Sequence, residues 1–487
     1  MNEQTGVVVV GAGAAGLTAA LLLARSGIEV VVVERDSDGP PDTADAALGV
    51  WRRPGIPQFG NGHAFHGLAR LILRDRLPHV LDALLDAGIT ERRFYLGIPE
   101  DRRVAADVDL VALQARRPVF DWALYRAVLE QPGVRLLAGQ SVVALSGDRD
   151  GISGVILDNG TRIRSAWVVD ATGHRRTLRQ ARQRIGLAAA TTATQPAPTF
   201  YYARHFRRLQ EARDPSGGGH FGLTGDLGYL RFSVLEEDSC GFVVTMNSGA
   251  GEQPFRGLQN TAGWQAGAEA LPGLRELIDP RRAEPRSGVH TFSGRGNILL
   301  DFDPRSVTPG LVTVGDALCQ TNPTHGWGIS IALKGAAIVA DALARSDTDR
   351  TRTTREVTST LASFVRPFFQ SASAEDQERL RQGKNSTRGG AMDPSNPLFC
   401  RTVVYRLGSR DVDLYRAAQQ RIHLLADPRW LPANRNLLET AAALVRSELS
   451  NAPLAEWPTR HELEHRVGAA IASLASTYTP TREEVPR

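Results

Sequence analysis

Residues 6–35 read GVVVVGAGAAGLTAALLLARSGIEVVVVER, and this stretch decides the fold. Its two valine-rich runs, 6–10 and 28–33, have the length and composition of strands that are buried on both faces. The leucine- and alanine-rich segment 17–25 between them predicts a helix. A strand, a glycine-rich turn, a helix and a second strand that ends in an acid together predict a βαβ unit that binds a dinucleotide.

The three glycines of the turn and the acid have separate physical tasks. Gly11 permits the tight turn, and Gly13 lets the backbone approach a pyrophosphate. Gly16 lets the helix pack closely on the first strand, and the helix N-terminus offers N–H donors and a positive dipole to phosphates. Glu34, at the end of the second strand, is placed to accept hydrogen bonds from a ribose diol.

Composition excludes several classes of protein. The chain has 487 residues, of which 42% are hydrophobic and 23% charged, as is typical of a globular protein with more than one domain. Its three cysteines, Cys240, Cys319 and Cys400, lie far apart and exclude a disulfide framework and a zinc ribbon. The net charge is only +4 and no long run of like charges occurs, so no nucleic-acid partner is expected.

A membrane or secreted location is not expected either. The apolar stretch 6–24 is long enough to span a bilayer, but the dinucleotide turn explains its glycine spacing. Residues 1–5, before it, include no basic residue, unlike the start of a signal peptide. We therefore expect a cytoplasmic protein without integral membrane contact.

The character of the sequence changes along the chain. Strand-like segments at 199–206, 229–234 and 241–247, separated by glycine-rich turns, predict a mostly antiparallel sheet. A buried strand at 311–314 and a helix at 328–345 follow. The remainder reads as helices joined by proline and asparagine turns.

Four segments, in order along the chain, resemble the group A flavoprotein monooxygenases, the family of para-hydroxybenzoate hydroxylase. They are most similar to the branch that includes bacterial polyether epoxidases. The segments are 11–34, RPGIPQ at 53–58 followed by His63, RPVFDW at 117–122, and VGDA at 314–317 followed by NPTHGWG at 322–328. The resemblance covers roughly residues 1–350 of the sequence.

This resemblance implies an α/β fold: a Rossmann-type FAD-binding domain, a mostly antiparallel β substrate domain and a C-terminal helical region. We place the two parts of the FAD-binding domain at 1–175 and 301–350. The substrate-binding domain then covers 176–300, and the helical region covers 351–487.

The same resemblance implies FAD as the cofactor and assigns its contacts. Arg53 reaches the pyrophosphate, Arg117 is another FAD contact, and the backbone of Val142 meets the adenine. Asp316 holds ribityl hydroxyls, and residues 323–328 cradle the flavin pyrimidine at the N-terminus of a helix. The full predicted set is Gly11, Gly13, Ala15, Gly16, Glu34, Arg35, Arg53, Arg117, Val142, Asp316, Pro323, Gly326, Trp327 and Gly328, with no metal site.

The implied reaction is oxygen transfer centred on the flavin. Reduced FAD reacts with O2 to give a C4a-hydroperoxide, which inserts one oxygen atom into a small hydrophobic secondary metabolite by epoxidation or hydroxylation. No protein nucleophile or metal is required. His325 is a candidate catalytic side chain, and His205 and His220 are candidate acid–base groups.

The electron source is left open. Residues 170–173 read DATG, where the aromatic hydroxylases of the family carry an Asp-Gly pair linked to NAD(P)H use. Both NAD(P)H and a separate flavin reductase, as a partner protein, are consistent with this departure.

Other flavin chemistries compete with this interpretation. A flavin-dependent halogenase uses a lysine between the nucleotide motif and the substrate domain, and this chain has no lysine before Lys334. A flavin-dependent double-bond reductase and a cyclase or isomerase without net redox stay open, as does a non-catalytic flavin-binding scaffold. The C-terminal helices are expected to close the pocket or to form a dimer face, and the sequence does not decide between monomer and homodimer.

Overall fold

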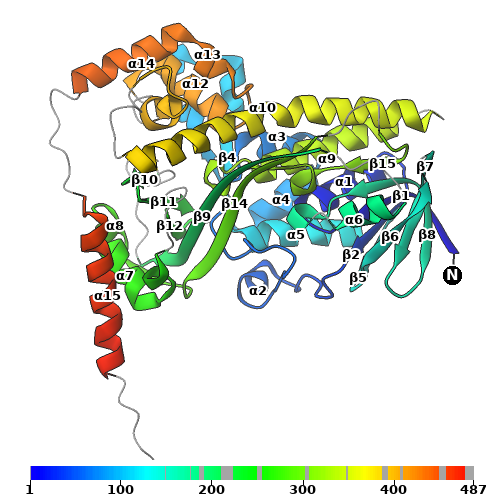
Figure 1. Ribbon diagram of the computed structural model, residues 1–487, viewed down its shortest axis with the longest axis horizontal. Coiled ribbons are helices and arrows are strands. Elements are labelled where there is room, and N and C mark those ends of the chain that lie inside the picture. The colour runs from blue at the N-terminus through cyan, green and yellow to red at the C-terminus, as the bar shows by residue number, and fades with distance from the viewer. Residues whose placement is uncertain are drawn as a thin grey trace, which may run out of the picture.

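Two seven-stranded sheets, helices packed on them and a cap of C-terminal helices make up the fold (Figure 1). A computed structural model describes residues 2–148, 150–175, 177–185, 191–209, 223–248, 255–301, 307–346, 349–385, 393–405, 410–448 and 457–477. The candidate acid–base residue His220 lies outside these described residues.

The first sheet carries the predicted βαβ unit. Its central strand β1 (Asn2–Val10) pairs in parallel with β2 (Val30–Glu34) and β8 (Arg162–Asp170). Valines along β1 and β2 are buried and alternate between the cores on the two faces of the sheet. The other strands are β5 (Val134–Ala138) and β15 (Leu311–Thr313), both parallel, and the antiparallel pair β6 (Val142–Asp148) and β7 (Gly151–Leu157).

Strand β8 runs without a break through a polar residue. Residues 162–164 and 167–169, on either side of it, belong to one continuous strand. Ser165 between them is a polar residue that reads as an interruption. Its buried Oγ lies 3.0 Å from the carbonyl oxygen of Gly6 and 2.6 Å from that of Trp167, so it satisfies its hydrogen-bonding needs within the sheet.

The helices on the first sheet begin where their caps predict. Helix α1 (Ala14–Arg25) follows Gly13, and α9 (Gly328–Ala344) confirms the helix expected over 328–345. Helix α5 (Arg117–Glu130) begins with Arg117 and Pro118, because proline is tolerated in the first turn of a helix.

Two short helices follow the loop after β2 and meet at Pro78. They are α3 (Gly67–Arg76) and α4 (Pro78–Asp86). The remaining small elements are α2 (Ala44–Gly49), β3 (Thr90–Arg93), β4 (Val111–Gln114), α6 (Leu178–Arg184) and α8 (Leu274–Leu277).

The second sheet is antiparallel, as predicted, and is built around one long strand. Strand β9 (Thr191–Arg208) pairs with β14 (His290–Asp301) over most of its length, and the sequence pattern indicated only residues 199–206. Pro196 falls beside a register shift at Gly294–Gly296 in β14, and this irregularity accommodates a residue that cannot donate to the ladder. The other strands are β10 (Leu223–Asp226), β11 (Leu230–Glu236), β12 (Gly241–Ser248), β13 (Ala283–Pro285) and β16 (Cys319–Gln320).

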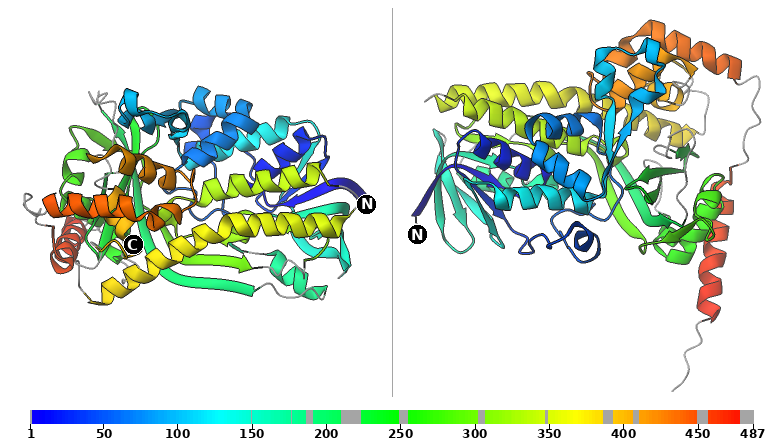
Figure 2. Two further views of the ribbon diagram at one scale, coloured as in Figure 1. Left: turned by 90° about the horizontal axis from the view of Figure 1, so that it is seen from above. Right: turned by 180° about the vertical axis from the view of Figure 1, so that it is seen from behind.

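The C-terminal helices divide into three parts. Helix α10 (Arg350–Asn385) lies beside α9 and reaches across to β14 of the second sheet (Figure 2). A cap follows, formed by the π-helical segment Cys400–Val404 with α12 (Val412–Ile422), α13 (Trp430–Ala433) and α14 (Arg435–Glu448). Helix α15 (Arg460–Thr477) packs away from this cap, on α7 (Thr261–Glu269) of the second sheet's core.

None of the described helices has the length and apolarity needed to cross a membrane.

Candidate functional site

The glycine-rich turn between β1 and α1 is packed against backbone at Gly11 and Gly16 and has free space at Gly13. Gly11 has a φ of +107°, and a Cβ there would lie 2.5 Å from the carbonyl oxygen of Ala171. A Cβ on Gly16 would lie 1.9 Å from the carbonyl oxygen of Gly11. Gly13 differs, because no atom lies within 4 Å of its Cβ position. The N-terminus of α1 is therefore accessible to a bulky anion on the Gly13 side.

Glu34 ties the end of β2 to this turn. Its two carboxylate oxygens accept hydrogen bonds from the backbone N–H groups of Ala12, at 2.7 Å, and of Asp36, at 2.9 Å. A carboxylate has further lone pairs, so Glu34 retains the capacity to accept from a ribose hydroxyl. Arg35, the next residue, is half-buried and lies 3.6 Å from Asp36.

Arg53 lies against the same turn, although it comes from the following loop. Its side chain is 1% exposed, and its Nη2 donates to the carbonyl oxygen of Ala12 at 2.9 Å. The guanidinium stacks over Trp51 and Tyr125, with 5.2 and 5.5 Å to the ring centroids. Among the described residues its Nε and Nη1 have no hydrogen-bond partner. A buried guanidinium with unused donors at a dinucleotide turn fits a diphosphate.

Arg117 lies at the first turn of α5 and is engaged by its neighbours. Its Nε donates to Asp121 at 2.6 Å, and its Nη1 lies 3.2 Å from His63 Nε2. Burial and the charge of Arg117 lower the pKa of His63 to about 3, so the ring is neutral. It therefore accepts from Arg117 at Nε2 and donates from Nδ1 to the carbonyl oxygen of Asn61 at 2.8 Å. The predicted contact of Arg117 with FAD stays a prediction.

Val142 starts β6 close to Glu34. The N–H of Gln140, two residues earlier, donates to the carbonyl oxygen of Glu34 at 2.9 Å. The side chain of Val142 is half-buried. The position is consistent with the predicted adenine contact, because the adenine and its ribose occupy the same end of a dinucleotide.

The Gly-Asp-Ala turn after β15 packs on the first turn of α1. Gly315 has a φ of +62°, and a Cβ there would lie 2.9 Å from the Cβ of Ala15. Asp316 follows directly and is half-buried. Residues more than 290 positions apart in the sequence are thus adjacent at the predicted cofactor site.

The segment 322–328 leads into α9 and resembles the turn before α1 in one respect. No atom lies within 4 Å of the Cβ position of Gly328, the first residue of α9. Gly326 has a φ of +71°, and a Cβ there would lie 2.7 Å from His66 Nε2. Pro323 is exposed and Trp327 is buried. The predicted flavin cradle thus has an accessible helix N-terminus beside a rigid turn.

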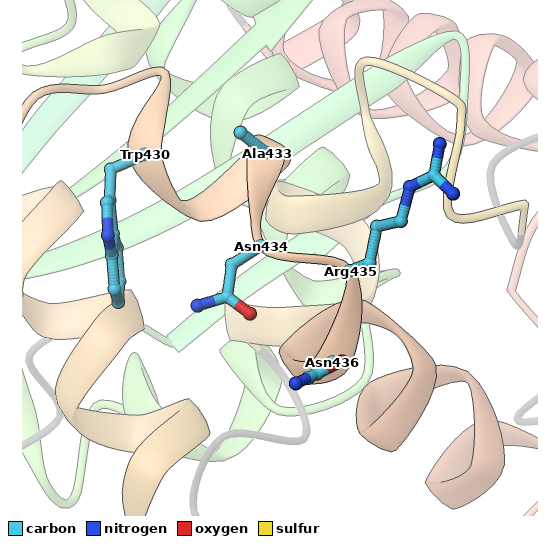
Figure 3. Close-up of a pocket in the computed structure, with 5 residues that line it drawn as sticks. All are labelled: Trp430, Ala433, Asn434, Arg435 and Asn436. Atoms are coloured by element: carbon cyan, nitrogen blue, oxygen red, sulfur yellow. The ribbon is translucent and has the colours of Figure 1, made fainter.

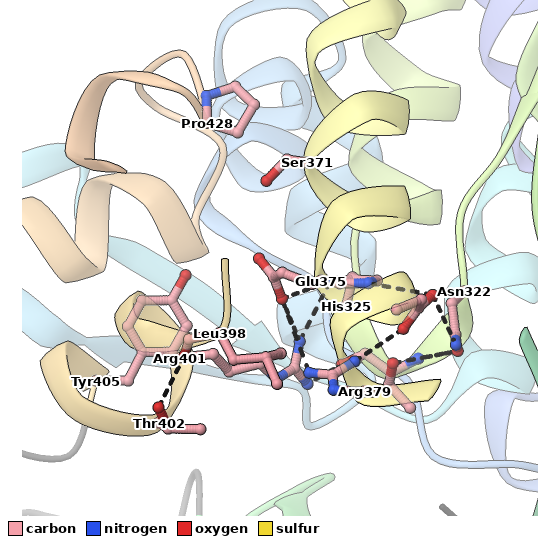
Figure 4. A network of polar contacts seen from close by, with 12 residues as sticks. Asn322, His325, Ser371, Glu375, Arg379, Leu398, Arg401, Thr402, Tyr405 and Pro428 are labelled. Carbon is pink, nitrogen blue, oxygen red and sulfur yellow. Dashed lines mark hydrogen bonds and ion pairs between the residues drawn. The ribbon is translucent and has the colours of Figure 1, made fainter. Parts of the chain in front are cut away.

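His325, the candidate catalytic residue, is fully buried in a network of charged side chains (Figure 4). Its ring stacks on Trp327 at 4.8 Å, and its Nδ1 accepts from Arg401 Nη1 at 3.2 Å. Glu375 and Asp376 of α10 lie 3.7 and 3.8 Å from its two ring nitrogens. Burial lowers the pKa of His325, so the ring is neutral. This placement suits a residue that holds the loop in position.

His205, the other described histidine candidate, joins the second sheet to the loop that carries Arg53. Its Nδ1 lies 2.9 Å from Glu237, and its Nε2 lies 2.9 Å from the carbonyl oxygen of Gly60. Burial opposes protonation, but Glu237 and the Gly60 carbonyl outweigh it and raise the pKa of His205. Both nitrogens are occupied by the protein, so His205 holds two segments together.

Sequence reasoning missed the charged partners of His325. Glu375, Asp376 and Arg379 lie on α10, Arg401 lies in the π-helical segment and Arg421 lies on α12. Single acidic and basic residues on amphipathic helices carry no motif. Only the folded structure, which packs these helices against the loop 322–328, brings the charged residues to His325.

One shallow hollow on the cap contains none of the predicted residues. It is lined by Trp430, Ala433, Asn434, Arg435 and Asn436, at the junction of α13 and α14 (Figure 3). It has no contact with the turn before α1 or the loop before α9.

Comparisons with known proteins show what the chain is similar to. Residues 4–47 match the family model described as "FAD binding domain". Over 70% of this chain and 76% of its own length, the menaquinone reductase of Mycolicibacterium smegmatis is 27% identical. The ubiquinone hydroxylase UbiM of Neisseria meningitidis is 24% identical over 70% of this chain and 68% of its own length.

A solved structure shows the same fold. PqsL, a probable FAD-dependent monooxygenase from Pseudomonas aeruginosa, superposes with a TM-score of 0.54 and 17% identity, covering 79% of this chain and 97% of PqsL. The chain is therefore an FAD-dependent oxidoreductase. Within that class, the predicted resemblance to the group A flavoprotein monooxygenases is confirmed.

Proposed function

We propose that this protein is a monooxygenase that inserts one oxygen atom of O2 into a small hydrophobic substrate, by epoxidation or hydroxylation. The observation that carries the proposal is the convergence of two accessible helix N-termini, at Gly13 and Gly328, with the buried Arg53 and the half-buried Asp316. The hydroxylase among the relatives supports the reaction class.

Different residues of the chain would bind each part of FAD. Gly13 and Arg53 would hold the diphosphate, Glu34 the adenosine ribose, and Asp316 the ribityl chain. The loop 323–328 and the N-terminus of α9 would hold the flavin pyrimidine. When bound, FAD supplies the redox chemistry, through the C4a-hydroperoxide that the family resemblance implies. One oxygen atom of O2 goes to the substrate and the other leaves as water, with two electrons and two protons from the donor.

The second sheet packs against the flavin loop and would form one wall of the substrate site. The Tyr201 hydroxyl on β9 donates to Asn322 Oδ1 at 2.9 Å, and Asn322 Oδ1 also accepts from the N–H of Thr324 at 3.2 Å. Burial raises the pKa of Tyr201, so the hydroxyl stays protonated and keeps this bond. A Cβ on Gly294 of β14 would lie 3.4 Å from Pro323 Cδ, so the sheet approaches the loop closely. A wall fixed in this way would help to hold the substrate beside the flavin, and closing the site to water favours oxygen transfer over loss of the oxidant.

A flavin-dependent double-bond reductase is the second candidate. The menaquinone reductase among the relatives favours it, and the DATG sequence at 170–173 permits it as well as the monooxygenase. In the structure the Thr172 Oγ1 donates a hydrogen bond to the Asp170 carboxylate at 2.7 Å, so two side chains of this segment bind each other. The electron source, NAD(P)H or a separate reductase, is common to both candidates.

The reaction of the reduced enzyme with O2 separates the candidates. The purified protein is photoreduced without air and mixed with oxygenated buffer in a stopped-flow spectrometer. A monooxygenase gives a transient single-band spectrum, blue-shifted from oxidised flavin, before reoxidation. Direct reoxidation, together with reduction of a substrate double bond in the absence of O2, would establish the reductase. An unchanged product mass would indicate the isomerase.

A further inference from the structure

We propose that the substrate carries an anionic oxygen group, a carboxylate or an ionised enol, which binds to Arg401 and Arg231 beside the flavin loop. This inference rests on the proposed function and names the substrate class of the same site. It follows from the balance of buried charge, from the partly exposed side chain of Arg401 and from the position of the two arginines.

The described residues around His325 carry more positive than negative charge. Glu375 lies 2.6 Å from Arg421, 3.7 Å from Arg379 and 3.9 Å from Arg401. Asp376 lies 2.9 Å from Arg379, and Asp226 lies 2.8 Å from Arg231. Four guanidinium groups therefore share three carboxylates: Arg231, Arg379, Arg401 and Arg421 against Asp226, Glu375 and Asp376.

Protonation does not remove this excess. Burial disfavours the charge of Glu375, but the adjacent Arg421 outweighs burial and lowers the pKa to about 2. Burial is outweighed at Asp376 too, where the proximity of the His325 ring and of Arg379 lowers the pKa, so both carboxylates are ionised at neutral pH. His325 is neutral and adds no charge. An excess positive charge away from bulk water is costly, and an anionic ligand would relieve it.

The excess positive charge reaches the surface mainly at Arg401. Arg379 and Arg421 have side chains that are 5% and 3% exposed, and both are held by carboxylates. The side chain of Arg401 is 30% exposed, although burial and the neighbouring Arg379 lower its pKa to about 10. Arg231 is 13% exposed, so Arg401 is the arginine of the four that an anion reaches most directly.

Arg231 faces the same neighbourhood from the second sheet. Its charge and those of Asp376, Arg379 and Arg401 all act on the buried Tyr201. Its Nε lies close to Asp226, but without hydrogen-bond geometry to any group among the described residues. Burial and the charge of Arg379 lower the pKa of Arg231, and the charge of Arg231 is among the causes that lower the pKa of Arg401. An anion between Arg231 and Arg401 would be attracted by both.

The position of Arg401 links this site to the flavin. Its Nη1 contacts His325 (Figure 4). Its Nη2 donates to the carbonyl oxygen of Thr324, so the guanidinium is fixed to the predicted flavin cradle. The rings of Tyr201 and Phe292, 5.7 Å apart on the second sheet, provide an apolar wall nearby. A conjugated substrate with an anionic end would place its ring on this wall and its charge on the arginines.

The test compares benzoate, a small aromatic carboxylate, with benzamide, its neutral counterpart. Each is titrated into the oxidised holoenzyme, and binding is followed by the change in the flavin spectrum. We expect benzoate to bind at least about tenfold more tightly than benzamide. We expect Arg401→Met and Arg231→Met each to weaken benzoate binding by about tenfold without changing benzamide binding.

Two further variants control the test. Arg352→Met, on the exposed face of α10, should leave both titrations unchanged. Arg401→Lys should restore part of the benzoate affinity, because it keeps the charge and loses the planar fork. FAD content is measured for every variant, so that loss of the cofactor, which would count against the proposed function, is distinguished from loss of the anion site.

Three results would overturn the inference. One is equal affinity of the holoenzyme for benzoate and benzamide, or no spectral change with either. Another is benzoate binding that survives in both methionine variants. The third is unchanged benzoate binding in Arg401→Met together with a lower flavin midpoint potential. The charge of Arg401 would then stabilise the reduced, anionic flavin and not a substrate anion.

Discussion

The turn before α1 and the charged cluster around His325 are both at the candidate site, but they are specified in opposite ways. The turn consists of consecutive small residues, and its geometry follows from the missing side chains of Gly11, Gly13 and Gly16. The cluster consists of long charged side chains from three distant helical segments, and its geometry follows from ion pairs such as Arg421 with Glu375. Steric sites of the first kind are local in the sequence, whereas charge-built sites of the second kind exist only in the folded chain.

The largest effect is expected in the cluster. Glu375→Gln removes the carboxylate that three arginines share, and leaves buried guanidinium groups without a counter-charge. We expect the free energy of unfolding to fall by about 3 kcal/mol, measured by urea denaturation of the holoenzyme. Glu356→Gln, on the exposed face of the same helix, is the matched control and should change it by less than about 1 kcal/mol. Equal effects of the two changes would show that the cluster is not a stabilising unit.

In the turn, two glycines should respond differently to the same added methyl group. Gly16→Ala places a Cβ against backbone, and we expect the free energy of unfolding to fall by about 2 kcal/mol. Gly13→Ala meets no atom within 4 Å, so stability of the apoprotein should be preserved while FAD affinity falls. Thermal unfolding of the apoprotein and FAD titration measure the two quantities. A stable, fully active Gly16→Ala protein would contradict the steric account of the turn.

Asp316 lies in the turn that packs on the first turn of α1, and its substitution tests the predicted contact with the ribityl chain. Asp316→Ala should reduce FAD affinity by about tenfold, because a charged hydrogen-bond acceptor is lost, and should leave the far-ultraviolet circular dichroism unchanged. Full flavin occupancy of this variant after gel filtration would contradict the predicted contact with the ribityl chain.

The smallest expected effect is on pH dependence. Burial lowers the pKa of His63 to about 3, whereas the unfolded chain titrates near 6.5. Between these values the unfolded state binds a proton that the folded state does not, so His63 reduces stability as the pH falls below about 6.5. The stability difference between pH 7.5 and pH 5.5 should therefore shrink by about 1 kcal/mol in His63→Asn. No change in this difference would show that His63 is protonated in the folded protein.

Features that depend on neighbouring residues in the sequence were predictable, and features that depend on tertiary packing were not. The βαβ unit, the helix from Gly328 and the antiparallel second sheet were predictable, because valine runs, glycine turns and strand-like patterns are local signals. The N-terminal half of β9 and most of β14 were not, since prolines, glycines and polar residues there hide a strand pairing that the second sheet imposes.

The site divides likewise. The turn residues and Arg53 were predicted from motifs, and the structure brings Arg53 to the carbonyl oxygen of Ala12. Arg401 and Glu375 could not be predicted, because nothing in their local sequence indicates that they face residue 325. Charged residues on helices usually face solvent, and only tertiary packing reverses that expectation.

The flavin content of the purified protein, read from its visible spectrum beside that of Arg53→Met, tests the central claim most directly. The account predicts one FAD per chain in the wild type, and a marked loss in Arg53→Met, whose Nε and Nη1 would no longer be available to the diphosphate. A colourless wild-type protein that also fails to take up added FAD, or an Arg53→Met protein with full flavin occupancy, would contradict it.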